Sequence, residues 1–181
     1  MCCIIIQPEQ TTDYLDIGFK SATICIALFN AYFAIKIFED KSKKDDTEKE
    51  RDRKIQLLKT LVLDHSFINF YTIFDEIEVD LLKLKQPNLT DTDKQAIDSN
   101  IQVLFIKLRR KFYDSLLAID ETLYDNILNK CDDLQSHFSL TIFDQGVNLS
   151  HVPKYDELIN EKLIDTKTEI IKTLFGYRGG Q

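Results

Sequence analysis

The sequence predicts an all-α protein with one N-terminal transmembrane helix that continues into a cytosolic bundle of long antiparallel helices. Two observations carry this prediction: an almost unbroken apolar run at Ile17–Phe38, and apolar residues at helical spacing through most of the chain after it. The run contains no proline, and its one glycine, Gly18, lies at its edge. At about 1.5 Å per residue it would extend about 33 Å, close to the ~30 Å hydrocarbon core of a bilayer.

Two other interpretations of this run compete with a membrane helix. A secretory signal peptide would have a basic start and a small-residue cleavage site, but acids Glu9, Asp13 and Asp16 precede the run. A buried core helix would fit the short charge-free stretch between Lys20 and Lys36. Both lysines lie near the ends of the run, where long side chains reach the headgroups, so the pattern favours a transmembrane helix at 14–38.

The distribution of basic residues predicts the orientation of this helix. Residues before the run include no Lys or Arg, whereas seven basic residues follow it: Lys41, Lys43, Lys44, Lys49, Arg51, Arg53 and Lys54. The positive-inside rule therefore places the N-terminus outside and the C-terminal domain in the cytoplasm of an inner (plasma) membrane. Residues 1–13 would then form a short outer tail.

The residues within the predicted span are not evenly distributed around the helix. At 100° per residue one narrow arc collects the polar and small side chains Lys20, Thr23, Ala27, Asn30 and Ala34. Lipid offers no hydrogen bond to an amide, so Asn30 should face another helix or water. Small residues allow helices to approach closely, and we therefore expect a homo-oligomer whose helices pack along this arc or line a pore with it. The alternative is a lone helix that tolerates one Asn.

After the span, residues 39–54 are charged at every position except Ser42 and Thr47. No proline or glycine interrupts this segment, which favours a solvated helical stalk over a disordered linker. Apolar residues then return at helical spacing and predict a helix over about 55–85, which Gln86, Pro87 and Asn88 end.

Two further helices complete the predicted cytosolic domain, 55–175. Thr90 and Asp93 have capping-box spacing, and the apolar pattern after them predicts a long helix over about 91–143, with a bend near residue 120 as an alternative. Residues 145–150 read as a loop. Pro153 suits the first turn of a helix over about 153–175, Gly176 can end that helix, and 176–181 would be a flexible tail.

No motif for catalysis, a metal or a cofactor is found in the sequence. It contains no glycine-rich phosphate loop, HExxH, CxxC or nucleophile elbow. The histidines, His65, His137 and His151, are far apart, and the cysteines lack metal-ligand spacing. The adjacent Cys2 and Cys3 fit two free thiols better than an interchain disulfide. We therefore expect a protein that is not an enzyme and needs no cofactor.

One local cluster of charge stands out from a chain whose net charge is -7. Lys107, Arg109, Arg110 and Lys111 are interleaved with Phe105, Phe112 and Tyr113. Basic groups beside aromatic rings can hold phosphates and stack bases, so Lys107, Arg109, Arg110, Lys111 and Tyr113 are a candidate phosphate or nucleic-acid site. The alternative, which the abundance of Asp and Glu favours, is a solvated face paired with acids of neighbouring helices.

In layout, one short span followed by a small helical cytosolic domain, the chain resembles single-pass membrane effectors of bacterial antiphage defence. The resemblance extends over the whole chain and rests on no sequence motif. It implies a channel-forming or membrane-disrupting effector, controlled by a nucleotide, an oligonucleotide or a protein bound to the cytosolic domain. A second hypothesis is a membrane-tethered scaffold that binds a protein partner through its helices. A third is a soluble helical bundle in which the first helix belongs to the core.

Overall fold

The computed structural model describes residues 14–180, except for the side chains of residues 14–19 and 21–24. Over these residues the chain forms helices and no strands, and the part after Glu48 forms a helical bundle, which confirms the predicted all-α class. The chain divides into two compact units, one that ends at Glu48 and one that begins at Lys49. The predicted outer tail, with Cys2 and Cys3, lies outside the described residues.

The first helix, α1, spans Tyr14–Leu57 and includes the predicted stalk. No glycine or proline follows Gly18 in this helix, so nothing in the backbone interrupts it. Thr47 donates its hydroxyl hydrogen bond to the carbonyl of Lys43 at 2.8 Å, one turn earlier. Every side chain from Cys25 to Glu48 is exposed.

The transmembrane helix predicted at 14–38 is not supported by the structure. Within the described residues, no helix carries a stretch that is both long and apolar enough to cross a bilayer. The described side chains from Cys25 to Phe38 include Asn30 and Lys36, and Glu39 and Asp40 begin the charged segment directly after them.

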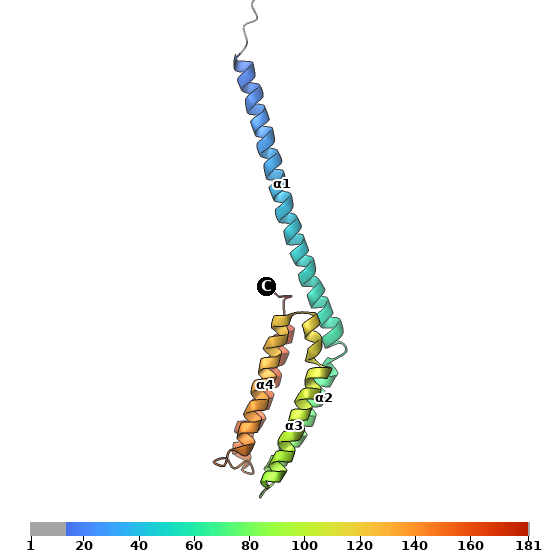
Figure 1. Ribbon diagram of the computed structural model, residues 1–181, viewed down its shortest axis with the longest axis vertical. Coiled ribbons are helices and arrows are strands. Elements are labelled where there is room, and N and C mark those ends of the chain that lie inside the picture. The colour runs from blue at the N-terminus through green and yellow to red at the C-terminus, as the bar shows by residue number, and fades with distance from the viewer. Residues whose placement is uncertain (1–13, 181) are drawn as a thin grey trace, which may run out of the picture. The chain divides into compact units, whose positions relative to one another are not determined.

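Four helices after α1 form an antiparallel bundle, in which α2, α3 and α4 run side by side (Figure 1). Two contacts for each pair fix the antiparallel directions. For α2 and α3 they are Asn69 with Lys111 and Glu76 with Lys107, and for α3 and α4 they are Asp98 with Ser139 and Arg109 with Tyr124. For α4 and α6 they are Lys130 with Glu169, and His137 with Leu158 just before α6; for α2 and α6 they are Asp75 with Lys167, and Lys85 just after α2 with Asp156 just before α6. The four helices are α2 Phe67–Leu82, α3 Asp91–Lys111, α4 Glu121–Phe143 and α6 Glu161–Gly176.

The core of the bundle lies between these four helices. Its largest fully buried side chains include Phe70, Phe74, Phe112 and Phe138. Cys131 is 1% exposed on α4, and burial, together with the nearby charge of Asp132, raises the pKa of its thiol to about 12. This thiol is therefore packed as a small apolar group.

The single helix predicted for 55–85 is divided in the structure. A π-helical segment, η1 Leu58–Leu63, follows α1, and a turn at 64–66 separates it from α2. The amide of Asp64 donates to the carbonyl of Lys59, and the hydroxyl of Ser66 donates to the carbonyl of Leu61. These bonds compete with the regular helical pattern and end the helix. At the far end, the 3₁₀ segment η2 Lys83–Lys85 precedes the predicted break, where Asn88 has a φ of 62°.

The long helix predicted over 91–143 is also divided, at the place where a bend was the alternative. A 3₁₀ segment, η3 Tyr113–Ala118, separates α3 from α4. The tighter turns bury both Phe112 and Tyr113, and Asp120 starts the next helix. The predicted capping box at the start of α3 is present, because Thr90 and Asp93 bond reciprocally. The last predicted helix comprises α5 Val152–Tyr155, the π-helical η4 Asp156–Asn160, and α6.

Candidate functional site

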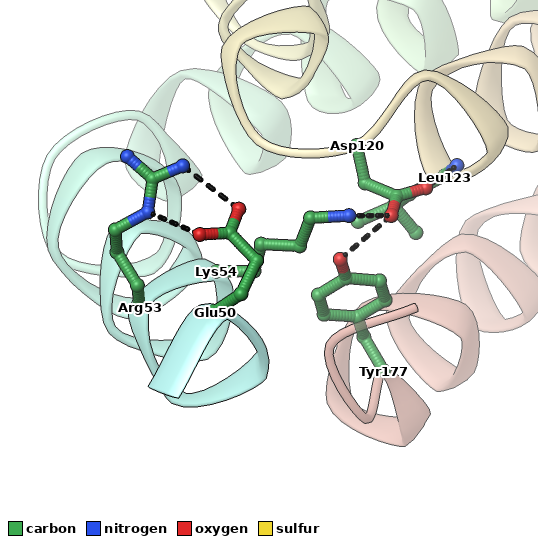
Figure 2. A network of polar contacts seen from close by, with 6 residues as sticks. All are labelled: Glu50, Arg53, Lys54, Asp120, Leu123 and Tyr177. Carbon is green, nitrogen blue, oxygen red and sulfur yellow. Dashed lines mark hydrogen bonds and ion pairs between the residues drawn. The ribbon is translucent and has the colours of Figure 1, made fainter. Parts of the chain in front are cut away.

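Asp120 joins three segments of the chain at one end of the bundle (Figure 2). Its Oδ2 accepts a hydrogen bond from Lys54 Nζ at 3.0 Å and another from the Tyr177 hydroxyl at 3.0 Å. Its Oδ1 accepts from the backbone amide of Leu123 at 3.0 Å, so the same carboxylate is the N-cap of α4. Near Lys54, Glu50 and Arg53 form their own two-bond ion pair on α1. We call Lys54, Asp120 and Tyr177 the Asp120 network.

The electrostatics of the network favour an ionised Asp120. The Asp120 side chain is 9% exposed, and this burial acts to raise its pKa. The bonds from Lys54, the Leu123 amide and Tyr177 outweigh burial and hold the pKa of Asp120 below its ordinary value. Burial and the bond to the Asp120 carboxylate raise the pKa of Tyr177. Because both of its oxygens accept hydrogen bonds from fixed donors, this carboxylate is suited to fastening segments.

The C-terminal glycines bring the backbone close to the same network. Gly179 and Gly180 have φ values of 91° and 77°, in the left-handed region that side chains other than glycine rarely adopt. A Cβ at Gly179 would lie 2.8 Å from the carbonyl oxygen of Arg51. At Gly180 it would lie 2.7 Å from Asp120 Oδ2. Tyr177–Gly180 therefore packs against α1 and Asp120, where the sequence predicts a flexible tail.

Sequence reasoning did not identify the Asp120 network, because its members are far apart in the chain. Lys54 belongs to a segment that reads as a uniformly charged stalk, and Tyr177 to one that reads as a tail. Two signals were available in the sequence. Asp120 directly precedes an apolar-periodic helix, as an N-cap does, and paired glycines are typical of unusual backbone conformations.

The structure places the candidate phosphate cluster at the end of α3 and pairs part of it with acids. Lys107 Nζ lies 2.8 Å from Glu76 Oε1 on α2. Arg109 bonds to Asp114 at 3.2 Å and donates to the Tyr124 hydroxyl at 2.7 Å. Arg110 and Lys111 are exposed, whereas Tyr113 is 2% exposed. The ring of Tyr113 is packed beside that of Tyr124, which takes it out of reach of a stacking base in this conformation.

The predicted polar arc of the N-terminal helix falls on α1. Ala27, Asn30 and Ala34 are exposed on it, and Lys20 is also exposed. The side chain of Thr23 lies outside the described residues. The rest of the segment exposes large apolar side chains: Ile26, Leu28, Phe29, Tyr32, Phe33, Ile35, Ile37 and Phe38. The structure thus brings an amide and two alanines together on a largely apolar stretch of α1.

The histidines and acids do not gather into a reactive group in the described part of the chain. His65 and His151 are exposed, and His137 Nε2 donates to the carbonyl of Leu158 on η4 at 2.7 Å. Among the side chains that the structure describes, no group of three or more His, Cys, Asp or Glu is arranged to hold a metal ion.

Comparison of the chain with protein-family models, curated proteins and solved structures finds no match. The resemblance to single-pass membrane effectors therefore stays one of layout.

Proposed function

We propose that the chain is a membrane-anchored, self-associating scaffold whose helical bundle binds a protein partner on the cytoplasmic side. The observation that carries the proposal is the exposure of large apolar side chains from Ile26 to Phe38 on α1. A run of exposed apolar residues on one helix marks a surface that another hydrophobic phase or protein covers.

The distribution of these side chains around the helix favours lipid over a single protein groove. At about 100° per residue, Ile26, Leu28, Phe29, Tyr32, Phe33, Ile35, Ile37 and Phe38 point in directions spread over most of the helix circumference. A helix that is apolar nearly all round is covered on all sides, as in a bilayer. A groove on one partner would cover one face alone.

The remaining arc of α1 supports self-association. Ala27, Asn30 and Ala34 lie between the large apolar side chains, one helical turn apart. In lipid, an Asn amide finds its hydrogen bonds on a neighbouring helix, and the small alanines allow that helix to approach. A second copy of this chain offers the same amide at the same depth.

The bundle supports a binding role over a catalytic one, and a protein partner over a nucleotide. Asp120, its most connected carboxylate, is occupied by Lys54, Leu123 and Tyr177. In the basic cluster Lys107 pairs with Glu76 and Arg109 with Asp114, so phosphate binding there would have to displace those acids.

Flotation with liposomes tests the membrane anchor. The full chain should float with vesicles and resist carbonate extraction, while a chain carrying Phe29→Glu and Phe33→Glu should stay in solution. The matched control carries Leu140→Glu and Ile164→Glu, two exposed apolar positions of the bundle, and should float like the wild type. Equal behaviour of the two double variants, or a wild type that stays in solution, would overturn the proposal.

A pore is the second candidate function, and Asn30 is the observation that favours it. An exposed amide flanked by Ala27 and Ala34 could line a narrow aqueous path in an oligomer. In a liposome flux assay a pore predicts leakage with the wild type and reduced leakage with Asn30→Leu. Replacement of residues 17–38 by polyleucine separates the two functions, because a scaffold keeps its membrane anchoring and partner binding, whereas a pore loses its leakage.

A further inference from the structure

We infer that Tyr177–Gly180 is a releasable strap, which fastens the C-terminal end of α1 to the start of α4. The strap segment follows α6 and crosses to the Asp120 network, where α1 and α4 already meet through Lys54 and Asp120. The inference concerns residues 49–180 alone and does not depend on the proposed membrane association.

The geometry of the glycines shows that this segment is fitted to α1. Gly179 is buried, and its Cα faces Arg51 so closely that a side chain would collide with the Arg51 backbone. Gly180 approaches Asp120 Oδ2 and Lys54 Nζ in the same way. Both residues have positive φ, and at Gly179 the approach is to backbone atoms of Arg51, which leaves no room for a side chain.

The hydrogen bonds that hold the strap are few, so its release breaks few of them. The Tyr177 hydroxyl donates to Asp120 Oδ2, the atom that Lys54 also bonds. A cavity of about 500 Å³ lies beside the strap, lined by Thr122, Asn126 and Thr173 among others. The strap therefore borders an open space, and Tyr177 is its one side chain that packs against the core, so opening it would uncover only that edge of the core.

The closed strap helps to hold the last turns of α1 against the bundle. The last turns of α1, Lys49–Leu57, contact the bundle through Lys54, through Leu57 at the edge of the core, and through the packing of Gly179 on Arg51. When the strap opens, these turns lose the contact at Arg51, and the Lys54 bond loses its neighbour Tyr177, while Leu57 stays packed. The strap is thus a conformational device that couples the C-terminal segment to the end of α1.

Hydrogen exchange of the full chain, read by mass spectrometry, tests the strap. In Gly179→Ala the amides of residues 49–57 should exchange at least about tenfold faster than in the wild type. Gly176→Ala is the matched control, because a Cβ there meets nothing within 4 Å, and it should leave these amides unchanged. Tyr177→Phe, which removes the hydroxyl alone, should act in the same direction with a smaller effect.

Two results would overturn the inference. One is exchange at 49–57 that does not differ between Gly179→Ala and Gly176→Ala. The other is an acceleration in Gly179→Ala that is equally large in α3, because that would make the segment an ordinary part of the global fold. Tyr177→Phe keeps the test decisive if Gly179→Ala does not fold.

Discussion

Asp120 combines two tasks that proteins usually give to different residues. It caps α4 through the Leu123 amide and ties Lys54 and Tyr177 to that cap. Loss of an N-cap costs about 0.5–2 kcal/mol, and a hydrogen bond to a charged group contributes about 1.5–3 kcal/mol. Asp120 should therefore matter more to stability than the other helix caps of the bundle.

Replacing Asp120 with Ala should lower the free energy of unfolding by about 2–4 kcal/mol at pH 7, because the cap and both cross-links are lost. Asp120→Asn should cost less, because an amide oxygen can still cap α4. Denaturant titration measures both. Glu121→Gln, an exposed change at the neighbouring position, should stay within about 0.5 kcal/mol of the wild type. A loss in Glu121→Gln equal to that in Asp120→Asn would contradict this assignment.

The stabilisation from the Asp120 charge should depend on pH with a defined sign. The pKa of Asp120 is lowered in the folded protein from an ordinary value of 3.8. Its contribution is therefore fully present above that ordinary value and is lost as the pH falls through the folded pKa. The difference in unfolding free energy between the wild type and Asp120→Asn should shrink below about pH 4. A difference that is the same at pH 7 and pH 3 would contradict the role of the charge.

Asp98 is the second carboxylate whose surroundings allow a sharp prediction. It is 8% exposed, and Ser139 and Gln102 donate to its two oxygens at 2.6 and 2.8 Å. Ser139→Ala leaves one buried oxygen without its donor and should cost about 1–3 kcal/mol in unfolding free energy. Ser136→Ala, an exposed serine on the same helix, is the control and should be nearly neutral. Equal costs in the two variants would argue against the Asp98 bond.

At the scale of the element, the start of α3 is set by its capping box. The Thr90 hydroxyl accepts from the Asp93 amide at 3.2 Å, and the Asp93 carboxylate accepts from the Thr90 amide at 3.0 Å. Thr90→Ala should therefore lower the unfolding free energy by about 1 kcal/mol, whereas the exposed Thr92→Ala should have a much smaller effect. Thermal melts of the two variants compare them directly, and a larger shift for Thr92→Ala would refute the cap.

The sequence pattern predicts helices well, and predicts their ends only where local chemistry marks them. Thr90 with Asp93 and the break after Gln86 are short-range signals, and the structure has both. The interruption at Phe112–Asp120 is different. There the apolar spacing continues, so periodicity alone cannot show that the chain tightens into 3₁₀ turns and reverses direction.

The candidate sites could be predicted only where neighbours in sequence are also neighbours in space. The arc of Ala27, Asn30 and Ala34 follows from helical spacing alone. In the Asp120 network, Lys54 lies 66 positions before Asp120 and Tyr177 lies 57 positions after it. No local pattern encodes such contacts. The same limit applies to the basic cluster, because the partner of Lys107 is Glu76 on another helix.

At the scale of the whole molecule, folding and the proposed anchoring belong to different parts of the chain. All the core residues among those described lie at Leu58 or later, and the second compact unit begins at Lys49. A chain that starts at Lys49 should therefore fold cooperatively, with a melting temperature within a few degrees of the full chain. Circular dichroism and calorimetry check this, and a non-cooperative melt would show that residues before Lys49 contribute to the core.

The two described cysteines differ in their access to solvent, and this difference can be used to measure opening of the bundle. Cys25 is exposed, whereas the Cys131 thiol is sealed in the bundle with a pKa raised to about 12. In a chain whose Cys2, Cys3 and Cys25 are replaced by Ser, a thiol-reactive dye would find its target only during openings that expose Cys131. The labelling rate would then report how often the bundle opens under native conditions.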